Sequence, residues 1–129
     1  MRRVLVIDDS EFDRRMITRA MKGVDESLSF AELDNGCKII ETMHHVKPDL
    51  VLLDIRMPGF GGFDVLDIIR ADDEFQTCHV IMISGSSSDG DKRTASQKGA
   101  SRYFTKPSSQ VGYKQIAEDI KEQFLHYAA

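Results

Sequence analysis

The chain has 129 residues, of which 41% are hydrophobic and 29% are charged, and its formal net charge is -4. This length suits one domain, and the composition argues against disorder. No apolar run approaches the roughly 20 residues of a membrane-spanning helix, and the negative charge disfavours direct binding to nucleic acid. We therefore expect a single domain over residues 1–129, located in the cytoplasm, without contact to membranes or nucleic acids.

The first residues of the chain and its two cysteines agree with that expectation. The first residues lead into a short apolar run that ends in two acids, which is not the pattern of a secretion signal. Cys37 and Cys78 lie far apart and form no CxxC motif. We expect them to be buried, reduced thiols rather than a disulfide or a metal site.

Five short apolar runs predict β-strands. They cover residues 4–7, 28–33, 50–53, 80–83 and 103–104. Several are continuous and rich in β-branched residues, which is typical of strands buried on both faces of a sheet.

Helical spacing of apolar residues fills the segments between these strands. The first predicted helix begins after Ser10, its expected N-cap, and Gly23 is its expected stop. The other helices are predicted around residues 39–46, 65–69, 91–98 and 111–124. The helix at 91–98 is polar and offers only Ala95 and Ala100 to a core, so we expect it to pack most weakly and to move most readily. The last helix has an apolar stripe of Val111, Ile116, Ile120 and Phe124.

Strand and helix thus alternate five times along the chain. This alternation predicts a doubly wound α/β fold, with a five-stranded parallel sheet, right-handed crossovers and five helices on its two faces. The C-terminal ends of parallel strands share one rim of the sheet, and ligands bind at that rim.

Three carboxylates follow two of the predicted strands. Asp8 and Asp9 end the first apolar run, and Asp54 ends the run at 50–53. Like charges gathered at one rim repel each other unless a cation joins them. A hard divalent ion such as Mg²⁺ prefers oxygen ligands and keeps room for phosphate oxygens. The acids therefore predict a magnesium site for phosphate chemistry.

The fourth and fifth strands add two further polar groups to the same rim. Ser84 ends the fourth strand, and Lys106, followed by Pro107, comes after the fifth. Either residue alone is weak support for a site, because serine often caps a turn and lysine is usually solvated. Acids, a hydroxyl and an ammonium in this order form a set that chance seldom assembles.

At this point the sequence resembles the receiver domains of two-component response regulators, over essentially its whole length. The matching segments are VLVIDDS (4–10), PDLVLLDIRMPG (48–59), VIMISG (80–85) and GASRYFTKP (99–107). The resemblance implies a flavodoxin-like sheet with strand order 2-1-3-4-5. It also implies that Asp54 accepts a phosphoryl group, that Asp8 and Asp9 help to hold Mg²⁺, and that Ser84 and Lys106 contact the phosphoryl oxygens.

Three finer expectations come from the same resemblance. The backbone carbonyl of Arg56 would complete the magnesium coordination. The Lys106–Pro107 bond would be cis and aim the lysine into the cleft. On phosphorylation Ser84 would move inward, Tyr103 would turn from a solvent-facing rotamer, and the surface of the fourth helix, fifth strand and fifth helix would change.

The resemblance also implies the kind of partner. The phosphodonor would be a sensor histidine kinase or a histidine phosphotransfer protein, and the chain would catalyse only its own phosphorylation and dephosphorylation. No output domain follows Lys106 within these residues, so the downstream target would be another, unknown protein. A chemotaxis-type regulator, a phosphorelay shuttle to a histidine phosphotransfer domain and a receiver excised from a longer protein all stay open.

Overall fold

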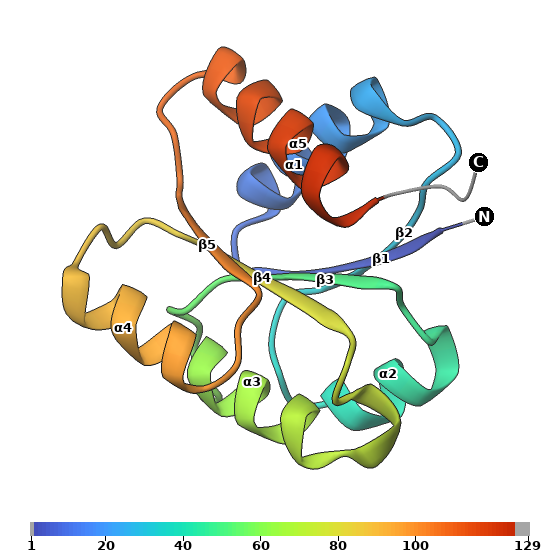
Figure 1. Cartoon of the computed structure of the whole chain (residues 1–129), viewed down its shortest axis with the longest axis vertical. Helices are drawn as coiled ribbons and strands as arrows, with labels where there is room; N and C mark the ends of the chain where they lie inside the picture. The colour runs from blue at the N-terminus through green and yellow to red at the C-terminus, as the bar shows by residue number, and fades with distance from the viewer. Residues whose placement is uncertain (1, 126–129) are drawn as a thin grey trace.

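The computed structural model describes residues 2–125 and contains one five-stranded parallel sheet (Figure 1). The strands are β1 (Arg3–Ile7), β2 (Ser29–Leu33), β3 (Leu50–Leu53), β4 (His79–Ser84) and β5 (Arg102–Thr105). Their order in the sheet is β2-β1-β3-β4-β5, and every neighbouring pair is parallel. The predicted flavodoxin-like fold is therefore confirmed.

Helices cover both faces of this sheet. They are α1 (Glu11–Val24), α2 (Ile39–Val46), α3 (Gly62–Ala71), α4 (Asp89–Gln97) and α5 (Gln110–Phe124), with a short 3-10 helix, η1 (Asp73–Phe75), after α3. In Figure 1, α1 and α5 lie on one face, whereas α2, α3 and α4 lie on the other. Within residues 2–125, no helix is both long and apolar enough to cross a membrane.

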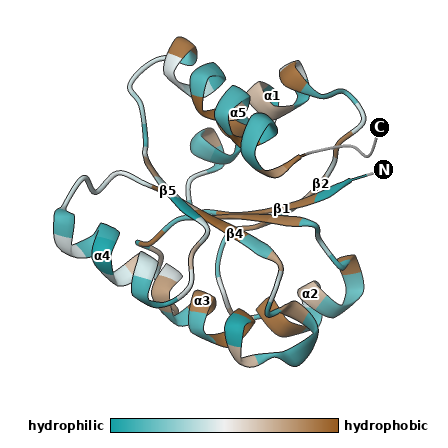
Figure 2. Cartoon of the chain, in the orientation of Figure 1, coloured by the Kyte–Doolittle hydropathy of each residue, from teal (hydrophilic) through white to brown (hydrophobic). Residues whose placement is uncertain are grey.

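Each face of the sheet has its own hydrophobic core, because successive side chains of a strand point to opposite faces. Val4 and Val6 of β1 pack with the residues of α1 and α5, while Leu5 and Ile7 pack with those of α2 and α3. The inner strands are accordingly mostly hydrophobic along the ribbon in Figure 2. Burial on both faces explains why the inner strands β1, β3 and β4 read as continuous apolar runs.

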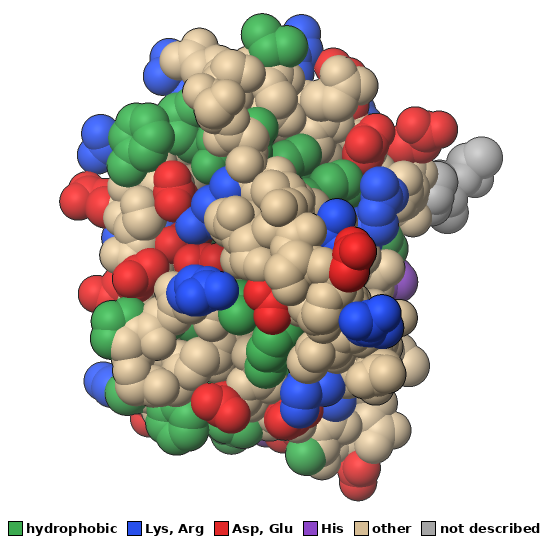
Figure 3. Space-filling model, turned by 90° about the vertical axis from the view of Figure 1, so that its left-hand side faces the viewer, with side chains coloured by type: hydrophobic (Ala, Val, Ile, Leu, Met, Phe, Trp, Pro, Cys, Tyr) green, Lys and Arg blue, Asp and Glu red, His purple; other side chains and the backbone are tan. Residues whose placement is uncertain are grey.

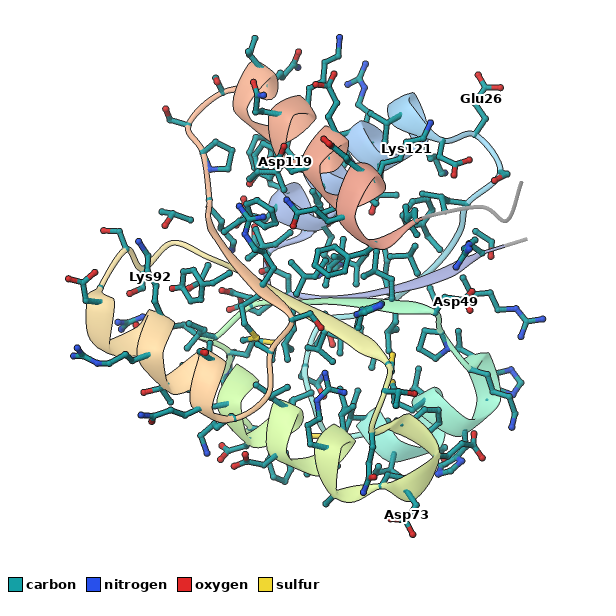
Figure 4. The ribbon with its side chains drawn as sticks, viewed as in Figure 1. Glu26, Asp49, Asp73, Lys92, Asp119 and Lys121 are labelled. Atoms are coloured by element: carbon teal, nitrogen blue, oxygen red, sulfur yellow. The ribbon has the colours of Figure 1, made fainter. Side chains whose placement is uncertain are left out.

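A polar contact also joins the two helices of the first face. Lys121 of α5 points toward the end of α1 (Figure 4), and its Nζ donates a 2.8 Å hydrogen bond to the carbonyl of Val24. This carbonyl lies in the last turn of α1, where helix carbonyls lack partners within the helix. The contact therefore satisfies a helix end and ties α5 to α1.

The structure corrects three details of the predicted elements. Helix α1 continues past Gly23 to Val24, and the amide of Asp25 still donates to the Met21 carbonyl. Val111 does not belong to the apolar stripe of α5, since it is 76% exposed. Cys37 is exposed rather than buried, because the turn that carries it lies outside both cores, and Cys78 is only partly buried.

The predicted weak packing of α4 is confirmed, whereas its readiness to move stays a prediction. Within residues 2–125, Ala95 is the residue of α4 that is buried. Ala100 follows the helix and is partly buried. Ser88 caps the helix by accepting a hydrogen bond from the Asp91 amide. Helix α4 thus depends on few apolar contacts.

Candidate functional site

The rim at the C-terminal ends of the strands brings the predicted acids together. Ile7 and Leu53 are paired in register on β1 and β3, so Asp8 and Asp54, one residue further on, leave the sheet side by side. The ligand oxygens of Asp8, Asp9 and Asp54 all lie within 4.8 Å of one another. Asp8 and Asp54 are buried, whereas Asp9 is exposed. Figure 3 looks onto the end of the molecule where acidic side chains gather.

Asp8 is fixed by contacts on both its side chain and its main chain. Its Oδ1 accepts a 2.9 Å hydrogen bond from the Ser10 amide, and its carbonyl accepts a 2.7 Å bond from Arg14 Nη1. Arg14 in turn pairs with Glu32 at 3.0 Å. Burial raises the pKa of the Asp8 carboxyl, and the neighbouring charge of Asp54 raises it further, although the bond to Lys106 opposes both effects.

Asp54 is held by the loop that follows it and by the start of α3. Its Oδ1 accepts a 2.8 Å hydrogen bond from the Ile55 amide. Gly62, the first residue of α3, donates from its amide to the Ile55 carbonyl at 2.7 Å. A Cβ atom at Gly62 would overlap the Asp54 carbonyl oxygen, so a glycine is required for this close approach. The start of α3 therefore supports Asp54.

Lys106 directly follows β5, and its side chain reaches over these acids. Its Nζ lies 2.9 Å from Asp8 Oδ2, 2.8 Å from Asp13 Oδ2 and 3.3 Å from Asp54 Oδ2. Burial alone would lower the pKa of the Lys106 ammonium, but the bonds to Asp13 and Asp8 and the charge of Asp54 outweigh burial and raise it. Lys106 is therefore charged at neutral pH.

The expected cis geometry of the Lys106–Pro107 bond is wrong for this structure, in which residues 2–125 contain no cis peptide. The trans form of an X-Pro bond is favoured by about 0.5–1 kcal/mol. Lys106 still reaches the acids, because its amide is fixed by a 2.7 Å bond to the Ser84 carbonyl and its long side chain covers the remaining distance.

Ser84 lies at the same rim and is completely buried. Its Oγ accepts a 3.3 Å hydrogen bond from the Ser86 amide. The Ser86 carbonyl in turn accepts a 2.6 Å bond from the Tyr103 hydroxyl. Ser84 and Tyr103 are thus linked through the β4–α4 loop.

Tyr103 does not face solvent, contrary to expectation. Its ring is partly buried against the core on the side of α3 and α4, and its hydroxyl has found the Ser86 carbonyl. A tyrosine with a partly buried ring is stabilised when its hydroxyl has a hydrogen-bond partner, and the Ser86 carbonyl is that partner.

Arg56, two residues after Asp54, is exposed. The proposed coordination by its backbone carbonyl stays a prediction. Asp13 is a residue of the site that sequence reasoning missed. It lies in the first turn of α1, directly after the acid pair and Ser10, and the only signal for it was an acid on a helix that begins at the rim.

The donor set fits a hard divalent cation. Three carboxylates converge, and carboxylate oxygen is the ligand type that Mg²⁺ prefers. One ammonium among Asp8, Asp13 and Asp54 leaves the cluster with an excess of negative charge. The rim is therefore suited to bind cations and, through them, the oxygens of a phosphoryl group.

This fold and site define a doubly wound α/β domain with an acidic cluster at the C-terminal ends of its strands. The family model of the response regulator receiver domain matches residues 4–118. The chain therefore belongs to the response regulator receiver family of two-component systems.

Curated relatives include both short and long proteins. The chemotaxis protein CheY of Listeria monocytogenes is 37% identical over 107 residues, which cover 83% of this chain and 87% of that protein. A protein-glutamate methylesterase/protein-glutamine glutaminase of Syntrophomonas wolfei is 34% identical over 126 residues, which cover 96% of this chain. The match covers 34% of that enzyme, so the chain spans about a third of its length.

Solved structures share the fold. The Mn²⁺-bound response regulator Rcp1 has a TM-score of 0.86 at 19% identity, with 100% of this chain and 98% of that chain covered. The response regulator domain of Thermotoga maritima CheB has a TM-score of 0.79 at 27% identity, with 97% and 94% covered.

Proposed function

We propose that the chain is a stand-alone receiver that takes a phosphoryl group onto Asp54 from a phosphohistidine of a sensor histidine kinase or a histidine phosphotransfer protein. The observation that carries this proposal is the convergence of Asp8, Asp9, Asp54 and Lys106 at one rim. The single domain over residues 1–129 is part of the same proposal.

The two oxygens of Asp54 have different roles in this reaction. Oδ1 is held by the Ile55 amide, whereas Oδ2 faces Lys106 at 3.3 Å. Oδ2 attacks the phosphorus of the donor, an O–P bond forms, and the N–P bond of the phosphohistidine breaks. The electron pair of that bond returns to the imidazole. The product is an acyl phosphate on Asp54.

Positive charge at the rim stabilises the transition state, in which negative charge spreads over the equatorial phosphoryl oxygens. The Lys106 ammonium supplies one such charge. Asp8, Asp9, Asp54 and the Arg56 carbonyl would hold Mg²⁺, which when bound supplies further charge and orients phosphoryl oxygens. Hydrolysis of the acyl phosphate at the same site would return the chain to its starting form, so the chain catalyses its own phosphorylation and dephosphorylation.

Phosphorylation would be passed to the surface through Ser84. The buried Ser84 Oγ accepts from the Ser86 amide and still has a hydroxyl hydrogen to donate to a phosphoryl oxygen. A movement of Ser84 toward Asp54 would pull on Ser86, whose carbonyl holds Tyr103. The surface of α4, β5 and α5 would then bind an unknown protein target differently. This change shifts an existing equilibrium between conformations.

Beryllofluoride and acetyl phosphate, each with Mg²⁺, test the assignment. Acetyl phosphate should add the mass of one phosphoryl group to the wild type, and Asp54→Asn should abolish that gain. Asp73→Asn, an exposed acid of η1, is the matched control and should keep it. Beryllofluoride should change the amide spectrum of the wild type but not of Asp54→Asn. Phosphorylation that persists in Asp54→Asn would refute the proposal.

Three outputs remain for the phosphorylated chain. The match over most of the Listeria CheY favours a regulator that acts by binding a target. A shuttle would instead lose its phosphoryl group to a histidine phosphotransfer protein. A pull-down with and without beryllofluoride, followed by a transfer assay with the captured partner, separates these two. If the natural chain is longer, as in the methylesterase relative, the target would be its own output domain.

A further inference from the structure

The Lys106 ammonium has a third carboxylate partner outside the acid cluster. Asp13 Oδ2 lies 2.8 Å from Nζ, at least as close as Asp8 at 2.9 Å and closer than Asp54 at 3.3 Å. Asp13 belongs to α1 and Lys106 follows β5, so 93 residues separate the two partners along the chain. The side chains of Lys106 and Asp13 are 16% and 25% exposed, so the contact is largely shielded from water.

Helix capping does not account for the Asp13 carboxylate. Asp13 donates from its amide to Ser10 Oγ, and in a capping box the side chain at this position would reach back to the amide of the N-cap residue. Here the Ser10 amide donates instead to Asp8 Oδ1. The carboxylate of Asp13 is therefore directed to Lys106 rather than to its own helix end.

We propose that Asp13 is a positioning residue that orients Lys106 for phosphoryl transfer, an inference that rests on the proposed function. An ammonium has three hydrogens to donate. Asp8 and Asp13 take two of them at short distance, so the third points to Asp54 Oδ2, where the phosphoryl group arrives. Without Asp13, one hydrogen has no fixed partner.

A lysine side chain loses much rotational freedom when its head group is fixed. Asp13 imposes that restriction before the donor binds, and its bond to Lys106 need not break when the Asp54 oxygen becomes the bridging oxygen of the acyl phosphate. Removing Asp13 should let the ammonium move among several positions, only some of which meet the phosphoryl oxygens. Because misplacing a catalytic group lowers the rate steeply, we expect a fall of roughly 10-fold.

Two substitutions separate orientation from charge. Asp13→Ala removes both the hydrogen-bond acceptor and the negative charge. Asp13→Asn removes the charge but keeps an oxygen that can accept from Nζ. If Asp13 orients Lys106, Asp13→Asn recovers most of the rate. If Asp13 acts only through its charge, the two variants behave alike.

The test measures phosphorylation of the full chain by acetyl phosphate and Mg²⁺ over a range of donor concentrations. Asp13→Ala should lower the saturating rate roughly 10-fold without raising the half-saturating donor concentration. Asp13→Asn should stay within about 2-fold to 3-fold of the wild type. Glu11→Ala is the matched control, since Glu11 lies in the same turn, is exposed and pairs with Arg15 rather than Lys106.

A second measurement reports the orientation without any reaction. The ammonium of Lys106 should give a slowly exchanging ¹H–¹⁵N signal in the wild type and in Asp13→Asn, and this signal should be lost in Asp13→Ala. If the melting curve shows that Asp13→Ala does not fold, Asp13→Ser replaces it. The serine side chain is too short to reach Lys106.

The results separate the inference from the function on which it rests. A wild type that is not phosphorylated on Asp54 would refute the proposed function. A phosphorylated wild type whose Asp13→Ala rate is equal or higher would overturn the positioning role alone. An Asp13→Asn rate as low as that of Asp13→Ala would also overturn it.

Discussion

The hydroxyl of Tyr103 donates a 2.6 Å hydrogen bond to the main-chain carbonyl of Ser86, and this bond joins the edge strand β5 to the β4–α4 loop. The same loop residue donates from its amide to Ser84 Oγ and from its hydroxyl to Asp91 in the first turn of α4. Ser86 therefore connects the rim, the edge strand and helix α4.

Tyr103→Phe should loosen this connection while keeping the ring. Loss of one neutral hydrogen bond should lower the free energy of unfolding by about 0.5–1.5 kcal/mol. Hydrogen exchange should accelerate at residues 85–91, because the loop loses an anchor, while exchange in α1 and α5 should not change beyond the global loss of stability. Equal exchange in the loop of both proteins would show that the Tyr103 hydroxyl does not hold it.

Magnesium should stabilise the wild type, because it binds the folded acid cluster and not the unfolded chain. At ten times the dissociation constant the gain is about 1.4 kcal/mol, measurable as a rise in melting temperature. Asp9→Ala should remove most of this gain. In the absence of Mg²⁺ the same variant should be no less stable than the wild type, because Asp9 is exposed and its loss relieves repulsion. Asp73→Ala should respond to Mg²⁺ as the wild type does.

Gly62→Ala and Gly23→Ala should change stability in opposite directions. A Cβ atom at Gly62 would overlap the Asp54 carbonyl, so this variant should lose about 1–3 kcal/mol and displace Asp54. A Cβ atom at Gly23, inside α1, meets nothing within 4 Å. Because alanine is the better helix former, Gly23→Ala should gain about 0.5–1 kcal/mol. Urea unfolding measures both, and a stable Gly62→Ala would mean that the start of α3 can shift.

The two cysteines should react at very different rates. Cys37 is exposed, whereas burial raises the pKa of Cys78 to about 11. At pH 8 a thiol reagent should therefore label Cys37 quickly and Cys78 only on unfolding, and Cys37→Ser should remove the fast phase. Rapid labelling of Cys78 in the folded Cys37→Ser variant would contradict its burial.

The raised pKa of Cys78 also predicts a pH dependence of stability. The folded chain holds the Cys78 proton more tightly than the unfolded chain does, so the group's contribution to stability is complete below pH 9.0 and is lost as the pH rises toward about 11. Urea unfolding at several pH values should show this decline in the wild type and a shallower one in Cys78→Ser.

Much of the fold follows from the sequence, because strands buried on both faces leave an unmistakable pattern. Leu50–Leu53 coincides with its predicted strand, since all four residues are buried. The pattern is weaker at the edge of the sheet, where β5 includes Arg102 and Thr105, which no apolar run could reveal. Gly23 does not end α1. The helix continues to Val24, and the amide of Asp25 donates the closing hydrogen bond to the Met21 carbonyl.

The site was predictable to the extent that strand ends define it. Asp8, Asp9, Asp54 and Lys106 converge because parallel strands deliver the residues that follow them to one rim. Asp13 lies on a helix, and its contact depends on how α1 turns and on where the Lys106 side chain extends, neither of which a linear pattern records. The inward Tyr103 likewise depends on a loop carbonyl and could not be read from residue types.

Ala95 is the buried side chain of helix α4 within the part of the chain that the structure describes, and most of the other side chains of this helix are exposed. Substitutions on such a helix cost little in folding, because almost none of its side chains has to fit a core. Evolution or a protein engineer could therefore rewrite this surface for a new recipient of the signal, while the chemistry at the rim and the two cores stays as it is.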